Sequence, residues 1–142
     1  MAAEPTRGLV DTNVLILRHL LSAESLPEEL AISAVSLAEL SAGVHLVNGN
    51  DPDAARERAA RLDLLQRVER EFEPFSFGTD AARRFGRMSA AVFAAGRTPR
   101  RRVADLMIAA TAAAEGLALY TTNPDDFLGL DGLVAVVTIE RP

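Results

Sequence analysis

Residues 103–121 read VADLMIAATAAAEGLALYT, and this stretch decides the fold class. Residues 103–115 predict a helix that is apolar on almost every side, Gly116 ends that helix, and residues 117–121 predict a buried strand. A helix this apolar is expected to lie inside the protein. A helix that leads directly into a buried strand is a building unit of α/β proteins.

The same alternation extends outward from this unit. Further strands are predicted at residues 7–11, 30–33 and 133–139, with residues 73–77 as an additional candidate. Further helices are predicted at residues 13–22, 36–48, 51–73 and 79–96, the last of them capped by Thr79 or Asp80. Strands that alternate with helices imply a mainly parallel sheet covered by helices on both faces. The sequence contains no internal repeat and no dividing linker, so residues 1–142 are expected to form a single domain.

Composition excludes several classes of protein. The chain is 49% hydrophobic and 25% charged, as in ordinary globular domains. It has no cysteine, which excludes disulfides, thiolate zinc sites, iron–sulfur clusters and a cysteine nucleophile. All 15 basic residues are arginine, so mechanisms that need a lysine are excluded, including that of a receiver domain.

Charge and hydropathy restrict the partners and the location. The net charge of −5 argues against a protein that coats nucleic acid, but it permits a nuclease with a local basic patch or a bound cation. No apolar run reaches the roughly 18 residues of a membrane span, and the N-terminus lacks a secretion-signal pattern. We therefore expect a cytoplasmic protein without membrane contact.

Four acidic residues lie at the ends of predicted elements. Asp11 ends the first strand, Glu39 and Asp105 lie in the first turns of helices, and Asp126 follows the strand at 117–121 across a short turn. In parallel sheets the ligand site lies beyond the carboxyl ends of the strands, so these acids are the candidates for one shared cleft.

Converging carboxylates repel one another unless a cation lies between them. With no cysteine and two histidines in the chain, the available ligands are mainly oxygen atoms, which favour Mg²⁺ or Mn²⁺. Such an ion orients and acidifies a water molecule and neutralises charge on a phosphodiester. The reaction class inferred from the residues is therefore metal-assisted hydrolysis of a phosphodiester.

A purely structural interpretation of these acids stays open on sequence grounds. Glu39 can be the capping-box partner of Ser36. Asn123 can cap the turn before Pro124, with Asp126 at the matching third position, and Asp105 suits a helix N-terminus. Under this interpretation the chain is a non-enzymatic regulator or a partner-binding α/β module.

Four motifs in order resemble those of PIN-domain ribonucleases. They are residues 10–16 (VDTNVLI), 33–43 (SAVSLAELSAG), 105–111 (DLMIAAT) and 121–127 (TTNPDDF). Among these ribonucleases, the chain is similar to the VapC-type toxins of bacterial toxin–antitoxin pairs. The resemblance runs from about Arg7 to Ile139.

This resemblance implies a three-layer α/β/α sandwich around a short, mainly parallel sheet. It also implies an Mg²⁺- or Mn²⁺-dependent endoribonuclease. Asp11 and Asp105 match the principal metal ligands, and Glu39 matches a third acid that binds metal or orients the attacking water. Asp126 is assigned as the fourth acid, although some family members carry an acid where this chain has Asn123.

Other residues and partners follow from the same resemblance. Thr12, Asn13 and Thr121 match polar residues that surround the acids, and Asn123 is expected to support the acids or to contact phosphate. The expected partners are an RNA substrate, a cognate antitoxin in the bacterial cytoplasm and a second copy of the chain. A nuclease that acts on DNA is the enzymatic alternative.

Two further stretches have a functional and a structural interpretation each. Arg97, Arg100, Arg101 and Arg102 can contact RNA phosphates or form a solvated loop. The predicted helix at residues 13–22 is apolar on nearly every face, which fits core packing or a groove for a partner peptide. The charged stretch at residues 51–70 is expected to be a solvated helix face.

Overall fold

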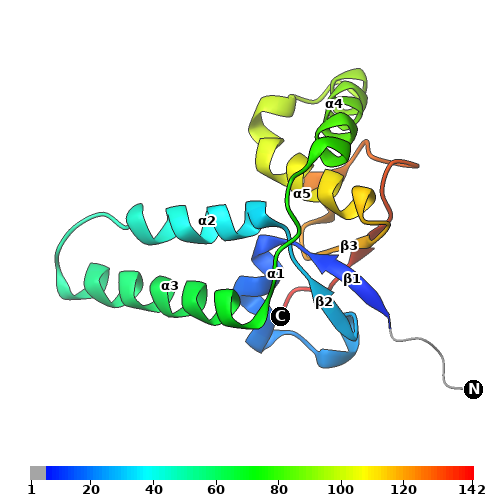
Figure 1. Cartoon of the computed structure of the whole chain (residues 1–142). Helices are drawn as coiled ribbons and strands as arrows, with labels where there is room; N and C mark the ends of the chain where they lie inside the picture. Colours follow the sequence, from blue (N-terminus) through cyan, green and yellow to red (C-terminus); the bar gives the residue numbers. More distant parts are fainter. Residues whose placement is uncertain (1–5) are drawn as a thin grey trace, which may run out of the picture.

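A computed structural model describes residues 6–142. The first half of the chain forms β1 (Arg7–Val10), α1 (Thr12–Leu17), the 3₁₀ turns η1 (Arg18–Leu20) and η2 (Ala23–Ser25), β2 (Glu29–Ala31), α2 (Ala34–His45) and α3 (Pro52–Glu71). The second half forms α4 (Thr79–Ala94), η3 (Pro99–Arg102), α5 (Val103–Ala114), β3 (Ala118–Thr121), η4 (Pro124–Phe127) and β4 (Val136–Thr138). Figure 1 shows α2 and α3 projecting together away from the sheet.

The sheet has the strand order β2-β1-β3-β4, and all three neighbouring pairs are parallel. Its residues alternate between the two faces, as the strand geometry requires. Leu9 packs in a core with α4 and α5, whereas the next residue, Val10, packs in a core with Val14 of α1 and Val68 of α3. Helices therefore cover both faces, which confirms the expected three-layer α/β/α sandwich around a parallel sheet.

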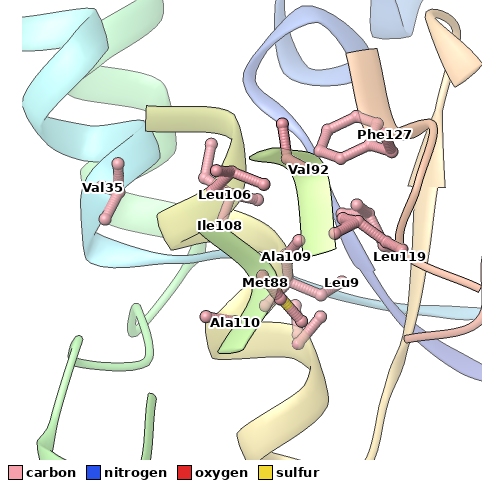
Figure 2. Close-up of a cluster of buried hydrophobic side chains, with 13 residues drawn as sticks. Leu9, Val35, Met88, Val92, Leu106, Ile108, Ala109, Ala110, Leu119 and Phe127 are labelled. Atoms are coloured by element: carbon pink, nitrogen blue, oxygen red, sulfur yellow. The ribbon is translucent and has the colours of Figure 1, made fainter. Parts of the chain in front are cut away.

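The larger core surrounds α5, the helix from which the fold was predicted. Leu106, Ile108 and Ala109 of α5 are at most 1% exposed and pack with Leu119 of β3 and Met88 of α4. Figure 2 shows these side chains gathered between α5, α4 and the sheet. The apolar character of α5 on nearly every side is thus explained by its place between two layers. Within residues 6–142, none of the helices is long and apolar enough to cross a membrane.

Three predicted elements are shorter in the structure. The first helix ends at Leu17, not at residue 22, and its continuation is a 3₁₀ turn. The last strand covers Val136–Thr138 rather than residues 133–139. These three residues are the ones that pair with β3, which ends at Thr121. The candidate strand at residues 73–77 reduces to one bridge between Phe75 and Ser33.

Two predicted helix caps are wrong. Ser33, not Ser36, is the N-cap of α2, and its side chain accepts a hydrogen bond from the backbone N–H of Val35. Ser36 instead lies inside α2 and is fully buried, so Glu39 is not its capping-box partner. Helix α4 begins after Gly78, which occupies the N-cap position where Thr79 or Asp80 was expected.

Candidate active site

The candidate site lies at the carboxyl edge of the sheet, where β1 and β3 end. Asp11 directly follows β1, and Thr121 is the last residue of β3. The backbone N–H of Asp11 donates to the carbonyl of Tyr120, which keeps the two strand ends in register. Parallel strands with short connections to helices place ligand sites at this edge.

Asp11 is a buried acid held by two hydrogen bonds. Its side chain is the N-cap of α1, and its Oδ1 accepts from the backbone N–H of Val14 at 3.0 Å. Its Oδ2 accepts from the Thr121 hydroxyl, and that hydroxyl oxygen accepts from the backbone N–H of Asn123 at 2.9 Å. Burial raises the pKa of Asp11, and the charges of Asp126 and Glu39 add to that increase, while the two hydrogen bonds oppose it.

Asp105 lies in the first turn of α5 and is partly exposed. Burial, followed by the charges of Asp126, Glu39 and Asp11 in that order, raises its pKa to about 6. Arg102 is the group that lowers it. The charges of Glu39 and Asp126 thus reach both Asp11 and Asp105, as expected for acids that face a shared cleft.

Glu39 reaches this region from the second turn of α2 rather than the first. The Thr12 hydroxyl lies 2.6 Å from Oε1 of Glu39 and donates to it. The hydroxyl oxygens of Thr12 and Ser36 lie 2.9 Å apart. Glu39 is exposed, so this contact fixes a side chain that would otherwise move freely.

Asp126 is paired with an arginine. Its Oδ1 accepts from Nη1 of Arg102 at 2.8 Å, with both side chains partly exposed. Arg97, Arg101, Arg102, Asp105 and Asp126 line a hollow of about 320 Å³. Three of the four arginines in the basic stretch thus lie beside the acids, whereas Arg100 does not line this hollow.

A larger groove of about 950 Å³ opens beside the acids. Asp11, Glu39 and Asp105 line one end of it. The rest is lined by α1, α2 and α3, with exposed Ile16 among its apolar residues and Arg18, Arg61 and Arg67 among its charged ones. Most of residues 51–70 are exposed, which confirms the predicted solvated face, and one side of α3 in addition forms a wall of this groove.

The structure brings some predicted polar residues to the acids and leaves others outside. Thr12 and Thr121 each hydrogen-bond an acid directly. Asn13 is exposed but lines the larger groove. Asn123 occupies the N-cap position of η4 without a side-chain capping bond. Sequence reasoning considered Ser36 only as a helix cap and missed its buried hydroxyl beside Thr12, because burial inside a helix is not visible in the motif. It also missed the groove wall from α3, which lies outside the four motifs.

The donor chemistry of the site fits a hard divalent cation. The four acids supply only oxygen atoms. Burial, and after it the charges of neighbouring acids, raise the pKa of Asp11 and of Asp105, so a positive charge among them would be stabilised. In the described conformation of residues 6–142, no three acidic or histidine side chains are close enough to hold one ion. One of the four acids, Asp126, forms an ion pair with Arg102.

Residues 8–133 match the PIN domain as a protein family. The chain belongs to the PIN-domain family. Ribonuclease VapC5 of Mycobacterium tuberculosis is 36% identical to this PIN domain over 142 residues, which cover 98% of each chain.

Solved structures agree with this assignment. The PIN domain matches VapBC-5 from Mycobacterium tuberculosis, a member of the VapBC family of toxin–antitoxin systems, with a TM-score of 0.76 at 36% identity. That match covers 96% of this chain and 100% of the other. It also matches FitAcB from Neisseria gonorrhoeae, with a TM-score of 0.65 at 26% identity over 92% and 96% of the two chains. The PIN domain is therefore of the VapC type.

Proposed function

We propose that this PIN domain is a ribonuclease that acts as the toxin of a toxin–antitoxin pair. The likeness to ribonuclease VapC5 over nearly the whole of both chains supports this activity. The observation that carries the proposal is the placement of Asp11, Glu39 and Asp105 around one groove, with Asp126 beside Asp105 in the adjoining hollow. We further propose that cleavage is endonucleolytic and requires Mg²⁺ or Mn²⁺, and that residues 1–142 act as one domain, of which residues 1–5 lie outside the described structure.

Each acid has a proposed role. Asp11 and Asp105 are the principal ligands of the divalent ion, and Asp126 is a fourth acid that Arg102 neutralises in the metal-free protein. Glu39 binds the ion or orients the attacking water. When bound, the ion would acidify that water and offset charge on the phosphodiester. Thr121 holds the carboxylate of Asp11 in place, and Thr12 does the same for Glu39. Asn13 and Asn123 are proposed as supporting or phosphate-contacting residues.

The arginines beside the acids are proposed to contact RNA phosphates. Arg97, Arg101 and Arg102 line a hollow that also contains Asp105 and Asp126, which supports this role for them, and Arg100 is exposed on the same turn. A triple Arg100→Ala, Arg101→Ala, Arg102→Ala variant should bind RNA with a shallower dependence on salt, because fewer phosphates are neutralised. An unchanged salt slope would show that the stretch is a solvated loop.

The larger groove is proposed to receive the antitoxin. VapBC-5 is described as a toxin–antitoxin system, and this PIN domain is similar to it over 96% of its length. Exposed Ile16 and the apolar part of α3 supply the kind of surface on which a partner helix docks. We also propose a homodimer, which light scattering of the purified chain would test. An RNA substrate accords with a cytoplasmic location, which is likewise proposed.

RNA cleavage by the purified chain, freed from any partner, tests the proposal. The assay compares total RNA with Mg²⁺, Mn²⁺ or EDTA, and Asp105→Asn is the control for contaminating nucleases. Cleavage with either ion that is lost in EDTA and in the variant would support the proposal. DNA in the same assay tests the alternative nuclease. If Asp105→Asn leaves both cleavage and growth arrest on expression unchanged, the acids do not perform the chemistry.

A further inference from the structure

Ser36 is a buried residue of α2 whose hydroxyl has no role in the function proposed above. It is the third residue of α2 and 0% exposed. Its Oγ lies 2.9 Å from Oγ1 of Thr12, and the same Thr12 oxygen lies 2.6 Å from Oε1 of Glu39. Ser36 and Glu39 are three residues apart on α2, so both face the start of α1, where Thr12 lies.

Counting hydrogens fixes the direction of this chain of contacts. The Thr12 hydroxyl carries one hydrogen, and an ionised carboxylate can only accept. The short contact to Glu39 therefore uses the Thr12 hydrogen. The contact between the two hydroxyls must then use the hydrogen of Ser36, which donates to Thr12. Ser36 therefore donates to Thr12, and Thr12 donates to Glu39.

We propose that Ser36 is a positioning residue that aims the Thr12 hydroxyl at Glu39. This inference rests on the proposed function, since it matters for catalysis if Glu39 takes part. A hydroxyl rotates about its C–O bond, so its hydrogen can point in several directions. When Ser36 donates to the Thr12 oxygen, the direction toward Glu39 becomes the favourable one for the Thr12 hydrogen. Hydrogen bonds in such a chain also strengthen one another. Ser36 is fixed within a helix whose N-cap, Ser33, is itself fully buried.

A structural role alone makes a different prediction. If the Ser36 hydroxyl only makes a stabilising contact within the fold, its removal changes the free energy of unfolding and leaves kcat unchanged. If it orients Glu39, its removal lowers kcat and leaves KM unchanged, because Glu39 is proposed to bind the ion or to orient the attacking water rather than to hold the RNA. The split between the two kinetic constants therefore separates the interpretations.

The test measures kcat and KM for RNA cleavage by Ser36→Ala, Thr12→Val and the double variant, with thermal unfolding of each. Ser36→Ala is expected to lower kcat by about five- to tenfold, the effect of one hydrogen bond. In the Thr12→Val background the same change should have no further effect, since the path to Glu39 is already broken. Ser36→Cys replaces the hydroxyl by a somewhat larger thiol that donates a weaker hydrogen bond, so an intermediate kcat is expected, and this variant also serves if Ser36→Ala does not fold.

Ser89→Ala is the matched control. It also removes a buried helix hydroxyl, and the Ser89 Oγ has no hydrogen-bond partner among the described residues. Its kcat should equal that of the unchanged protein.

Two failures are distinguishable in this experiment. A Glu39→Gln variant that cleaves as fast as the unchanged protein would overturn the proposed role of Glu39. A Glu39→Gln variant that is inactive beside a fully active Ser36→Ala would overturn the role of Ser36 alone. An equal loss of kcat for Ser36→Ala with and without Thr12→Val would also overturn it.

Discussion

At the scale of single residues, Asp105 is an acid whose ionised form is unfavourable in the folded protein. Burial and three neighbouring carboxylates raise its pKa to about 6. Between the unfolded value near 3.9 and this folded value, the folded protein binds more protons, so its stability falls as the pH rises through that window. A carboxylate that is costly to ionise in the folded protein is typical of a site that binds a cation or accepts a proton from its substrate.

Asp105→Asn should therefore stabilise the metal-free protein at neutral pH. Because Asp105 is partly exposed, solvent reduces the cost of its charge, and we expect a gain of about 1–2 kcal/mol above pH 7 and none below pH 4. Urea unfolding in EDTA at both pH values measures it. Asp125→Asn, which changes an exposed neighbour of Asp126, is the control. Equal stability of Asp105→Asn and the unchanged chain at pH 7.5 would refute this prediction.

Thr121 and Thr122 offer a matched pair of threonines. The Thr121 hydroxyl donates to buried Asp11, whereas the Thr122 hydroxyl, also buried, has no hydrogen-bond partner within residues 6–142. Thr121→Val should destabilise the chain by about 1–3 kcal/mol, because it leaves a buried carboxylate short of a donor. Thr122→Val should be neutral or stabilising. Thermal unfolding compares the two, and equal effects would mean that the bond to Asp11 contributes nothing.

At the scale of elements, strand β1 requires a glycine. A Cβ added at Gly8 would overlap the ring of Tyr120, which lies two residues beyond the strand partner of Gly8 in β3. The added Cβ would also lie 3.3 Å from Cγ of Pro27, which is closer than an ordinary contact. Gly8 therefore allows β1 to lie beside β3 and to deliver Asp11 to the sheet edge.

Gly8→Ala should cost about 1–3 kcal/mol, as overpacking does in a well-packed region. Gly78→Ala is the control, since a Cβ there meets nothing within 4 Å. Urea unfolding of both variants measures the difference. A Gly8→Ala chain that is as stable as the control would show that Tyr120 moves aside freely.

The elements also show what the sequence could predict. The helix and strand at residues 103–121 follow from composition alone, because an apolar helix followed by glycine and a short apolar strand has few alternatives. The first helix was predicted too long, since apolar residues recur at Leu20 and Leu21 while the backbone tightens into a 3₁₀ turn at Arg18–Leu20. Such a change of geometry leaves no mark on hydrophobic periodicity.

At the scale of the whole molecule, the position of the acids was predictable and their surroundings were less so. Acids at strand ends converge because parallel strands share one carboxyl edge. The pairing of Arg102 with Asp126, and the use of α3 as a groove wall, join segments that are distant in sequence. Periodicity describes one element at a time, so contacts of this kind appear only in the fold.

The central claim is that these acids bind a divalent cation and cleave RNA with it. The most direct measurement is titration of Mn²⁺ into the EDTA-treated chain, followed by electron paramagnetic resonance, with RNA cleavage measured on the same samples. We predict that cleavage rises with bound Mn²⁺ and that Asp105→Asn loses both, while Asp125→Asn keeps both. Cleavage of RNA at full rate without bound metal, or Mn²⁺ binding unaffected by Asp105→Asn, would contradict the account.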